Sequence, residues 1–306
     1  MAERRVLVTG ATGLIGRNVV SALRESGVEV HAATRSLTHV THDGEVRWHK
    51  ANLLDHRDRT QLLDAAAPQT VIHCAWVTEH GAYWTSPENL DWVGATLSLA
   101  REAHDRGTSR FVGVGTCAEY EWGGAAPLSE ASTPLRPQTL YGVAKNATRS
   151  VLDAFCTARG LEFAWGRVAM LYGAGEHPDR FVAAVARALA KGKPAKISSG
   201  TAVRDFMDAR DVGGAIAALA MTKVTGAVNI ASGEAISLLD TARTLARLAS
   251  KPELLTPGAL PDRPGDPLSL AVDATRLHRD VGYRPKLTLE QGLSDALAYW
   301  RAQVAS

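Results

Sequence analysis

Short apolar runs rich in β-branched residues alternate with longer amphipathic segments along the first half of the chain. The apolar runs predict strands at residues 5–9, 28–34, 46–50, 70–75, 110–115 and 161–168. The segments between them have helical periodicity and predict helices from the first glycine-rich turn to about residue 26, and at 57–66, 90–106 and 140–159. Strands that alternate with helices are typical of βαβ units, so we expect a doubly wound α/β fold with a parallel sheet.

The second half is less regular. It predicts a helix at 180–191 and strands at 203–207 and 227–231 around a helix at 209–221. Ser237-Leu-Leu-Asp240 and Thr288-Leu-Glu-Gln291 have the spacing of capping boxes and each opens a further helical pattern. The stretch 256–267 carries four prolines and two glycines and is expected to be a loop.

Composition places the chain among ordinary globular proteins. Its 306 residues are 45% hydrophobic and 22% charged, and the length suits about two domains of ~150 residues. The 34 basic and 32 acidic residues nearly balance, at a net charge of +2, which gives no footprint for nucleic acid or a membrane surface. No run approaches the roughly 18 apolar residues of a transmembrane helix. A small anionic ligand stays compatible, since a few arginines suffice to bind it.

The three cysteines, Cys74, Cys117 and Cys156, show no CxxC spacing. They predict free thiols in a reducing compartment rather than a disulfide framework or a zinc site, and no metal is expected. The chain runs from Met1 through two arginines directly into an apolar strand, without the apolar core of a secretory signal. A cytoplasmic location is therefore expected.

A glycine-rich turn connects the first predicted strand to the first predicted helix. Backbone amides can approach a pyrophosphate here only where no Cβ intervenes, and the helix N-terminus favours negative charge. The turn therefore predicts a dinucleotide site formed by Gly10, Thr12, Gly13, Leu14, Ile15 and Gly16. The alternative is a plain strand-to-helix turn.

The second predicted strand ends in Thr34-Arg35, where an NAD site usually carries an Asp or Glu for the ribose hydroxyls. A guanidinium can hold a 2′-phosphate, and no carboxylate repels it. Arg35 therefore favours NADP(H), although NAD(H) stays compatible. An exposed surface arginine is the alternative interpretation.

Tyr141 and Lys145 stand four residues apart and so share one helix face. An unperturbed phenol, with a pKa of ~10, exchanges protons poorly near neutrality, and a nearby ammonium lowers that pKa. The lysine could also hydrogen-bond the nicotinamide ribose. A lone pair of this kind is common by chance, and becomes informative only together with the glycine-rich turn.

The glycine-rich turn combined with Tyr141-Gly-Val-Ala-Lys145 resembles the extended short-chain dehydrogenase/reductase family, in its epimerase/dehydratase branch that modifies nucleotide sugars. The resemblance covers essentially the whole chain. It implies a Rossmann domain, which we place at 1–172 and 203–234, and a smaller substrate-binding lobe at 173–202 and 235–306. The strand ending at Ala75 resembles the family strand that passes beside the cofactor, and Asn52-Leu53 stands where the family has Asp-Leu near the adenine.

Residues Gly115 to Tyr120 resemble the family's stretch with a catalytic hydroxyl, which implies that Thr116 binds the substrate carbonyl oxygen. A strand-end threonine bonded to backbone is the alternative. Dehydratases follow this residue with Asp-Glu as acid and base, and here Cys117-Ala118 replace them. On an extended strand end Glu119 would face away from Ala118, so we expect no dehydration.

Two arginines in the second half, Arg204 and Arg263, lie in segments that resemble the family's Arg-Asp and Arg-Pro-Gly-Asp motifs. The resemblance implies that they contact the diphosphate of a nucleotide sugar, to which a guanidinium fork is well matched. Surface arginines are the alternative. Other candidates for lining the substrate pocket are His80, His177, Trp76, Trp84 and Trp92.

The sequence thus predicts an NADP(H)-preferring ketoreductase of a nucleotide-linked keto sugar, such as an NDP-4-keto-6-deoxyhexose. Thr116, Tyr141 and Lys145 are its expected catalytic residues. The alternatives are an NAD-dependent nucleotide-sugar epimerase, a reductase of small ketones of the flavonoid type, and a non-catalytic NADP-binding sensor. The resemblance also implies a homodimer formed through the helices at 90–106 and 140–159.

Overall fold

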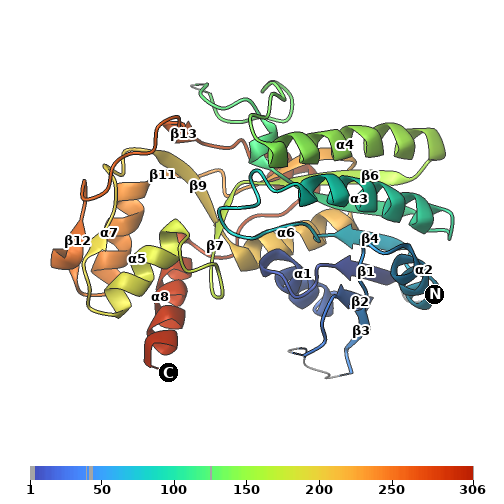
Figure 1. The fold of residues 1–306 in the computed structure, drawn as a ribbon, viewed down its shortest axis with the longest axis horizontal. Helices are drawn as coiled ribbons and strands as arrows, with labels where there is room; N and C mark the ends of the chain where they lie inside the picture. The colour runs from blue at the N-terminus through green and yellow to red at the C-terminus, as the bar shows by residue number, and fades with distance from the viewer. Residues whose placement is uncertain (1–3, 39, 41–43, 125, 306) are drawn as a thin grey trace.

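The computed structural model describes residues 4–38, 40, 44–124 and 126–305. Residues 1–3, on which part of the leader prediction depends, lie outside these ranges. A large parallel sheet with helices on both faces adjoins a smaller group of helices and short strands (Figure 1). No helix in the described part of the chain is long and apolar enough to cross a bilayer.

The described residues form a central sheet of seven parallel strands in the order β10-β6-β5-β4-β1-β2-β3. These strands are β1 (Arg5–Thr9), β2 (Glu29–Thr34), β3 (Val46–Lys50), β4 (Thr70–His73), β5 (Arg110–Thr116), β6 (Glu162–Val168) and β10 (Gly226–Ile230). The order reverses at β1, which pairs with both β2 and β4. The doubly wound fold is therefore confirmed, and ligands of such sheets bind beyond the strand ends at this reversal.

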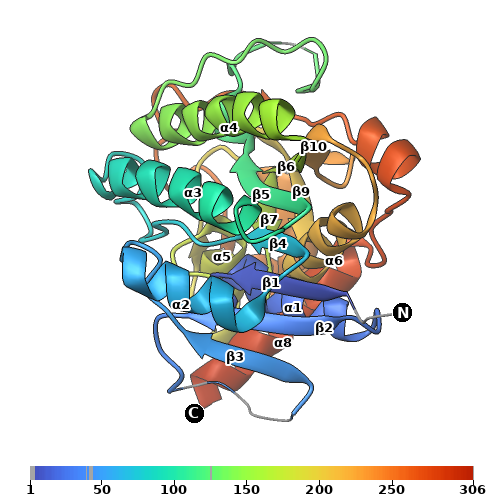
Figure 2. The same ribbon diagram turned by 90° about the vertical axis from the view of Figure 1, so that its right-hand side faces the viewer.

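Helices cover both faces of the sheet: α1 (Leu14–Arg24), α2 (His56–Ala66), α3 (Glu88–His104), α4 (Leu140–Arg159) and α6 (Ala209–Met221). Successive residues of a strand face opposite ways, so Val6 and Val8 pack toward α1 and α6, and Leu7 packs toward α2, α3 and α4. Figure 2 shows α3 and α4 side by side above the sheet. Both faces are thus buried, as parallel sheets require.

The smaller part has its own apolar core, in which Leu189, Leu245 and Leu297 meet. Its elements are β7 (Met170–Tyr172), α5 (Phe181–Ala190), β8 (Ala195–Lys196), β9 (Val203–Asp208), β11 (Ala235–Ser237), α7 (Leu238–Leu248), β12 (Leu255–Thr256), β13 (Ser269–Leu270) and α8 (Leu289–Ala305). β9 pairs with β7, β11 and β13 and not with the central sheet. The predicted boundary at residue 203 assigned this strand to the Rossmann domain, and the domain boundaries stay a prediction.

The last two long helices, α7 and α8, begin at the predicted capping residues Ser237 and Thr288. The Ser237 hydroxyl accepts the Asp240 amide at 3.0 Å at the start of α7. At α8 the box is reciprocal, because the Thr288 hydroxyl accepts the Gln291 amide at 3.2 Å and Gln291 Oε1 accepts the Thr288 amide at 2.9 Å.

One carboxylate joins α6 to the segment that precedes α8. Asp211 is 2% exposed and accepts hydrogen bonds from the Tyr283 hydroxyl (2.8 Å) and from the amides of Lys286 (2.9 Å) and Leu287 (3.1 Å). On its other side α6 packs closely on α1, where a Cβ at Gly213 would overlap the backbone of Asn18. The end of the chain is therefore hydrogen-bonded to α6, the helix that packs on α1 after the glycine-rich turn.

Candidate active site

The glycine-rich turn has the close approaches that its sequence predicts. Gly10 has φ +65°, and a Cβ there would lie 2.7 Å from the Ala75 amide nitrogen after β4. A Cβ on Gly16 would overlap the Gly10 carbonyl oxygen. The turn, α1 and the end of β4 are thus packed backbone against backbone, which only glycine allows.

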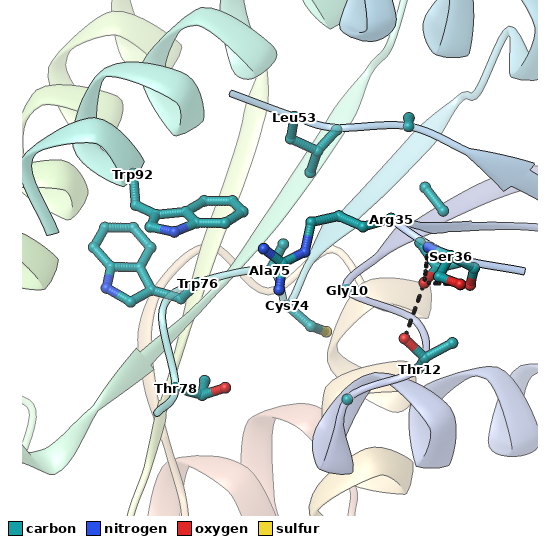
Figure 3. Close-up of a pocket in the computed structure, with 14 residues that line it drawn as sticks. Gly10, Thr12, Arg35, Ser36, Leu53, Cys74, Ala75, Trp76, Thr78 and Trp92 are labelled. Atoms are coloured by element: carbon teal, nitrogen blue, oxygen red, sulfur yellow. Dashed lines mark hydrogen bonds between the residues drawn. The ribbon is translucent and has the colours of Figure 1, made fainter. Parts of the chain in front are cut away.

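A cavity of about 350 Å³ opens at this turn, beyond the ends of β1, β2 and β4 (Figure 3). Six of the predicted cofactor residues line it, namely Gly10, Thr12, Gly13, Arg35, Leu53 and Ala75. The cap residue of α1, Gly13, offers no side chain to the first amides of the helix. Free helix amides at a concave surface fit a pyrophosphate, so the pocket fits a dinucleotide.

The other predicted cofactor residues lie differently. Leu14 and Ile15 pack against the apolar core under α1. The Asn52 side chain accepts the Leu54 amide at 3.3 Å and is engaged in its own turn rather than in the pocket. Sequence reasoning did not assign Ser36, Cys74 and Thr78, which also line the cavity.

Arg35 is exposed and extends across the cavity between Leu53 and the glycine-rich turn (Figure 3). The hydroxyl of its neighbour Thr34 makes two hydrogen bonds. One is with the Thr12 hydroxyl (3.0 Å), and the other is donated to the Ser36 carbonyl oxygen (3.1 Å). The described lining residues include no Asp or Glu. The rim of the cavity therefore carries a positive charge where many NAD sites carry a negative one.

The structure brings Thr116 and Tyr141 together. Thr139 caps α4 by accepting the Gly142 amide at 3.1 Å, and a Cβ on Gly142 would overlap the Ala118 carbonyl oxygen. This close approach sets the first turn of α4 against the end of β5. The Tyr141 phenol consequently lies near the Thr116 side chain, which lowers the pKa of the phenol.

Aromatic rings enclose the phenol of Tyr141. Tyr83 and Trp84 meet its ring edge-on, at centroid distances of 4.9 Å and 5.7 Å. Burial raises the pKa of Tyr141, the neighbouring Tyr83 raises it further, and the hydrogen bond with Thr116 opposes the shift. The phenol is therefore protonated at neutral pH and is a proton donor.

Lys145 lies one helical turn further along α4 and is 4% exposed. Its Nζ donates to the Val114 carbonyl oxygen at 2.8 Å and lies 3.8 Å from the centroid of the Trp76 ring, which lines the cavity. Burial lowers the pKa of Lys145 to about 7, against the opposing effect of the Glu119 charge. Among the described residues its ammonium thus bonds to β5, and the predicted lowering of the Tyr141 pKa by this lysine is not what the geometry produces.

The turn after β5 corrects one step of the sequence argument. Residues 117–119 form a 3₁₀ turn (η1, Cys117–Glu119) rather than an extended strand end, because Thr116 and Glu119 cap it reciprocally. Glu119 Oε1 accepts the Thr116 amide at 2.9 Å, and the Glu119 side chain is fully buried. Strand alternation therefore does not apply here, and the Glu119 carboxylate is buried and bonded to Thr116, Trp165 and Arg167.

The two arginines of the second half lie in different environments. Arg204 is 5% exposed, pairs with Asp266 at 2.6 Å and donates to the Pro267 carbonyl oxygen at 2.9 Å. Arg263 is exposed on the same proline-rich loop, and its charge lowers the pKa of His80 together with larger effects from burial and from His177 and Arg180. The structure brings both arginines to one loop, and their contact with a diphosphate stays a prediction.

A parallel sheet with a dinucleotide pocket at its strand reversal, and with Lys145 in contact with Trp76, which lines this pocket, is typical of an oxidoreductase of the short-chain dehydrogenase/reductase class. The chain belongs to the NAD dependent epimerase/dehydratase family, whose model matches residues 6–231. This family contains nucleotide-sugar enzymes that use nicotinamide cofactors.

Several relatives span the whole chain. A dTDP-6-deoxy-L-talose 4-dehydrogenase (NAD(P)(+)) of Kitasatospora kifunensis is 26% identical over 99% of this chain and 96% of its own. A dTDP-glucose 4,6-dehydratase of Neisseria meningitidis is 24% identical over 97% and 93%. The solved structure of MoeE5 in complex with UDP-glucuronic acid and NAD is 28% identical, with a TM-score of 0.83 over 98% of this chain and 99% of that one.

Proposed function

We propose that this enzyme is an NADP(H)-preferring ketoreductase of a nucleotide-linked keto sugar, such as an NDP-4-keto-6-deoxyhexose. The observation that carries the proposal is the protonated Tyr141 phenol beside the Thr116 hydroxyl, next to a pocket suited to a dinucleotide. The similarity to a sugar-nucleotide 4-dehydrogenase supports the substrate class. Cys117 and Ala118, in place of an acid and a base, argue against dehydration.

The residues divide the work as follows. Bound NADPH supplies the hydride that reduces the carbonyl carbon. Thr116 donates a hydrogen bond to the carbonyl oxygen, and Tyr141 transfers its phenolic proton to that oxygen as negative charge develops there. Lys145 keeps its bond to Val114 and presents its remaining N–H groups to the ribose hydroxyls. Arg204 and Arg263 would hold the diphosphate of the substrate.

An assay of NADPH consumption against a panel of keto-sugar nucleotides tests the proposal. We expect loss of the reduced-nicotinamide absorbance with at least one 4-keto sugar and formation of the matching alcohol, identified by mass spectrometry. No consumption with any member of the panel would contradict it. Copurified NAD and isomerisation of a substrate without net cofactor use would identify an epimerase instead.

Cofactor choice is expected to depend on Arg35. Replacing it by Asp removes a charge-assisted hydrogen bond, worth about 1.5–3 kcal/mol, and adds repulsion. The Kd for NADPH should rise about 10–100-fold, while the Kd for NADH changes little. Fluorescence titration with both dinucleotides measures this, and Arg57→Asp, the same charge change on exposed α2, is the control. Equal losses for both dinucleotides would show that Arg35 does not contact the 2′-phosphate.

We also propose that the enzyme is a homodimer joined through α3 and α4. Three large apolar side chains on these helices are exposed, Leu90 by 64%, Val143 by 47% and Val151 by 50%, and the helices lie side by side (Figure 2). Light scattering of the wild-type protein should give twice the 32.6 kDa mass of one chain. For the Val151→Glu variant it should give the mass of a single chain. Val304→Glu, an equivalent change on α8, should leave the dimer intact. A monomeric wild type would refute the proposal.

A further inference from the structure

A buried carboxylate lies directly behind Thr116, Tyr141 and Lys145, and the proposed reaction gives it no role. Glu119 is fully buried. Its Oε1 accepts the Thr116 amide at 2.9 Å and the Trp165 indole N–H at 2.8 Å. Its Oε2 accepts Nε of Arg167 at 2.7 Å. Both oxygens are thus fully engaged, so the carboxylate is held in one position.

The surrounding residues are shaped around this carboxylate. A Cβ on Gly115 would overlap both the Trp165 indole nitrogen and Glu119 Oε1, so only glycine leaves room for the pair. Arg167 is 2% exposed and donates a second hydrogen bond to the Tyr120 hydroxyl at 3.0 Å. Removing one partner of such a buried ion pair is strongly destabilising, so the position of the carboxylate is fixed.

The charge of Glu119 reaches both side chains of α4. It raises the pKa of Lys145, against the larger effect of burial, and it adds to the raised pKa of Tyr141. The other ionisable groups that face Lys145 are Cys74 and His73 at the end of β4. Cys74 remains a thiol because burial raises its pKa to about 12, and His73 remains neutral because burial lowers its pKa to about 3. Glu119 is therefore the carboxylate that acts on the ammonium, and the Trp165 indole that donates to Glu119 has its ring centroid 5.8 Å from Lys145 Nζ.

We propose that Glu119 is a positioning residue of the active site, which fixes Thr116 through its backbone amide and stabilises the charged ammonium of Lys145 from behind. The inference rests on the proposed roles of Thr116 and Lys145. A purely structural ion pair would stabilise the fold alone. Glu119 instead contacts the turn that carries the Thr116 hydroxyl and also acts on Lys145, the residue proposed to bind the ribose.

Glu119→Gln tests this, because the amide keeps an acceptor for the Thr116 amide and removes the charge. The readout is the affinity for NADPH between pH 5.5 and 9, followed by tryptophan fluorescence, since Trp76 and Trp165 flank the Lys145 ammonium. Wild-type affinity should fall as pH rises through the Lys145 pKa of about 7. In the variant the midpoint should move about one unit lower, the shift that loss of a nearby charge produces.

A second buried ion pair provides the matched control. Glu102 of α3 pairs with Arg59 of α2 at 3.1 Å, and both are nearly as buried as Glu119 and Arg167. Glu102→Gln should lower the melting temperature and leave the pH midpoint unchanged. If Glu119→Gln also lowers stability but leaves the midpoint where it is, the proposal is overturned.

Glu119→Gln leaves the Arg167 charge unpaired and could misfold for that reason. A double variant keeps the test valid in that case. Glu119→Gln/Arg167→Met removes both charges, keeps the acceptor for Thr116 and should show the same shift of the midpoint. The binding readout needs no turnover, so a shifted midpoint in a protein that reduces no keto sugar would uphold this inference and reject the proposed function. Wild-type affinity that is independent of pH would reject the inference alone.

Discussion

Replacing Tyr141 by Phe is expected to lower kcat for keto-sugar reduction by about 10²–10⁴-fold while dinucleotide binding is retained. The phenol is the protonated donor beside Thr116, and Phe keeps the ring that packs against Tyr83 and Trp84. The chemical step loses its acid, and the fold and the pocket lose nothing. Single-turnover kinetics and a parallel NADPH titration separate the two effects.

The neighbouring phenol of Tyr83 provides the control. Its ring centroid lies 4.9 Å from that of Tyr141, and burial raises its pKa to about 12, so it is a similarly buried, protonated phenol. Tyr83→Phe should change kcat by less than about tenfold, since Thr116 acts on the pKa of Tyr141 and not on that of Tyr83. A larger loss for Tyr83→Phe than for Tyr141→Phe would move the proton donor to Tyr83. Full activity of both variants would remove the phenols from the chemistry.

Lys145→Met is expected to abolish most activity and at the same time to stabilise the protein in the absence of dinucleotide. The ammonium is 4% exposed and has the Val114 carbonyl and the Trp76 ring as its contacts, which only partly replace water. Met has a similar length and packs well on an indole. Replacing a buried ion pair by apolar side chains of similar volume is neutral or stabilises by about 1–4 kcal/mol, and among the described residues Lys145 has no ion-pair partner that the change would leave unpaired.

The pH dependence of this gain has a definite sign. The folded chain releases the Lys145 proton near pH 7, whereas the unfolded chain holds it to about pH 10. Between these values the unfolded state binds more protons, so wild-type stability rises with pH. The advantage of Lys145→Met should therefore be largest at or below pH 7 and vanish toward pH 10.

Urea denaturation at several pH values measures the effect. Lys251→Met is the control, because the Lys251 ammonium also donates to a carbonyl oxygen, that of Leu189 at 3.0 Å, but is less buried. It should bring no gain and no added pH slope. Destabilisation by Lys145→Met at every pH would show that the ammonium is well solvated by its contacts after all.

Local signals predicted much of the fold. Predicted limits match for β1, β3 and α4, since glycines, caps and the change from strand to helix periodicity act within a few residues. The pairing of β9 with β7, β11 and β13 could not be foreseen, because it depends on contacts with strands that are remote in the sequence and too short to give a pattern of their own.

The site divides in the same way. The glycine-rich turn is a local motif with a steric reason, so Gly10 and Gly16 were predictable. The contact of Lys145 with Trp76 joins two elements that no spacing relates. The 3₁₀ turn at Glu119 was not predicted, because the partners of its carboxylate, Trp165 and Arg167, lie on β6, far away in the sequence. Side-chain direction at a strand end depends on such tertiary partners.

The hydrogen bonds to Asp211 join the end of the chain to α6, which packs on the helix that follows the proposed dinucleotide-binding turn. In a fragment that ended before Tyr283, the buried Asp211 carboxylate would lose its three hydrogen-bond donors, at a cost of about 1–3 kcal/mol for each group left unsatisfied. The loss would destabilise α6 first and then α1, which packs directly on α6. Shortening the chain from its C-terminal end should thus weaken dinucleotide binding, even though none of the described residues that line the cavity would be removed.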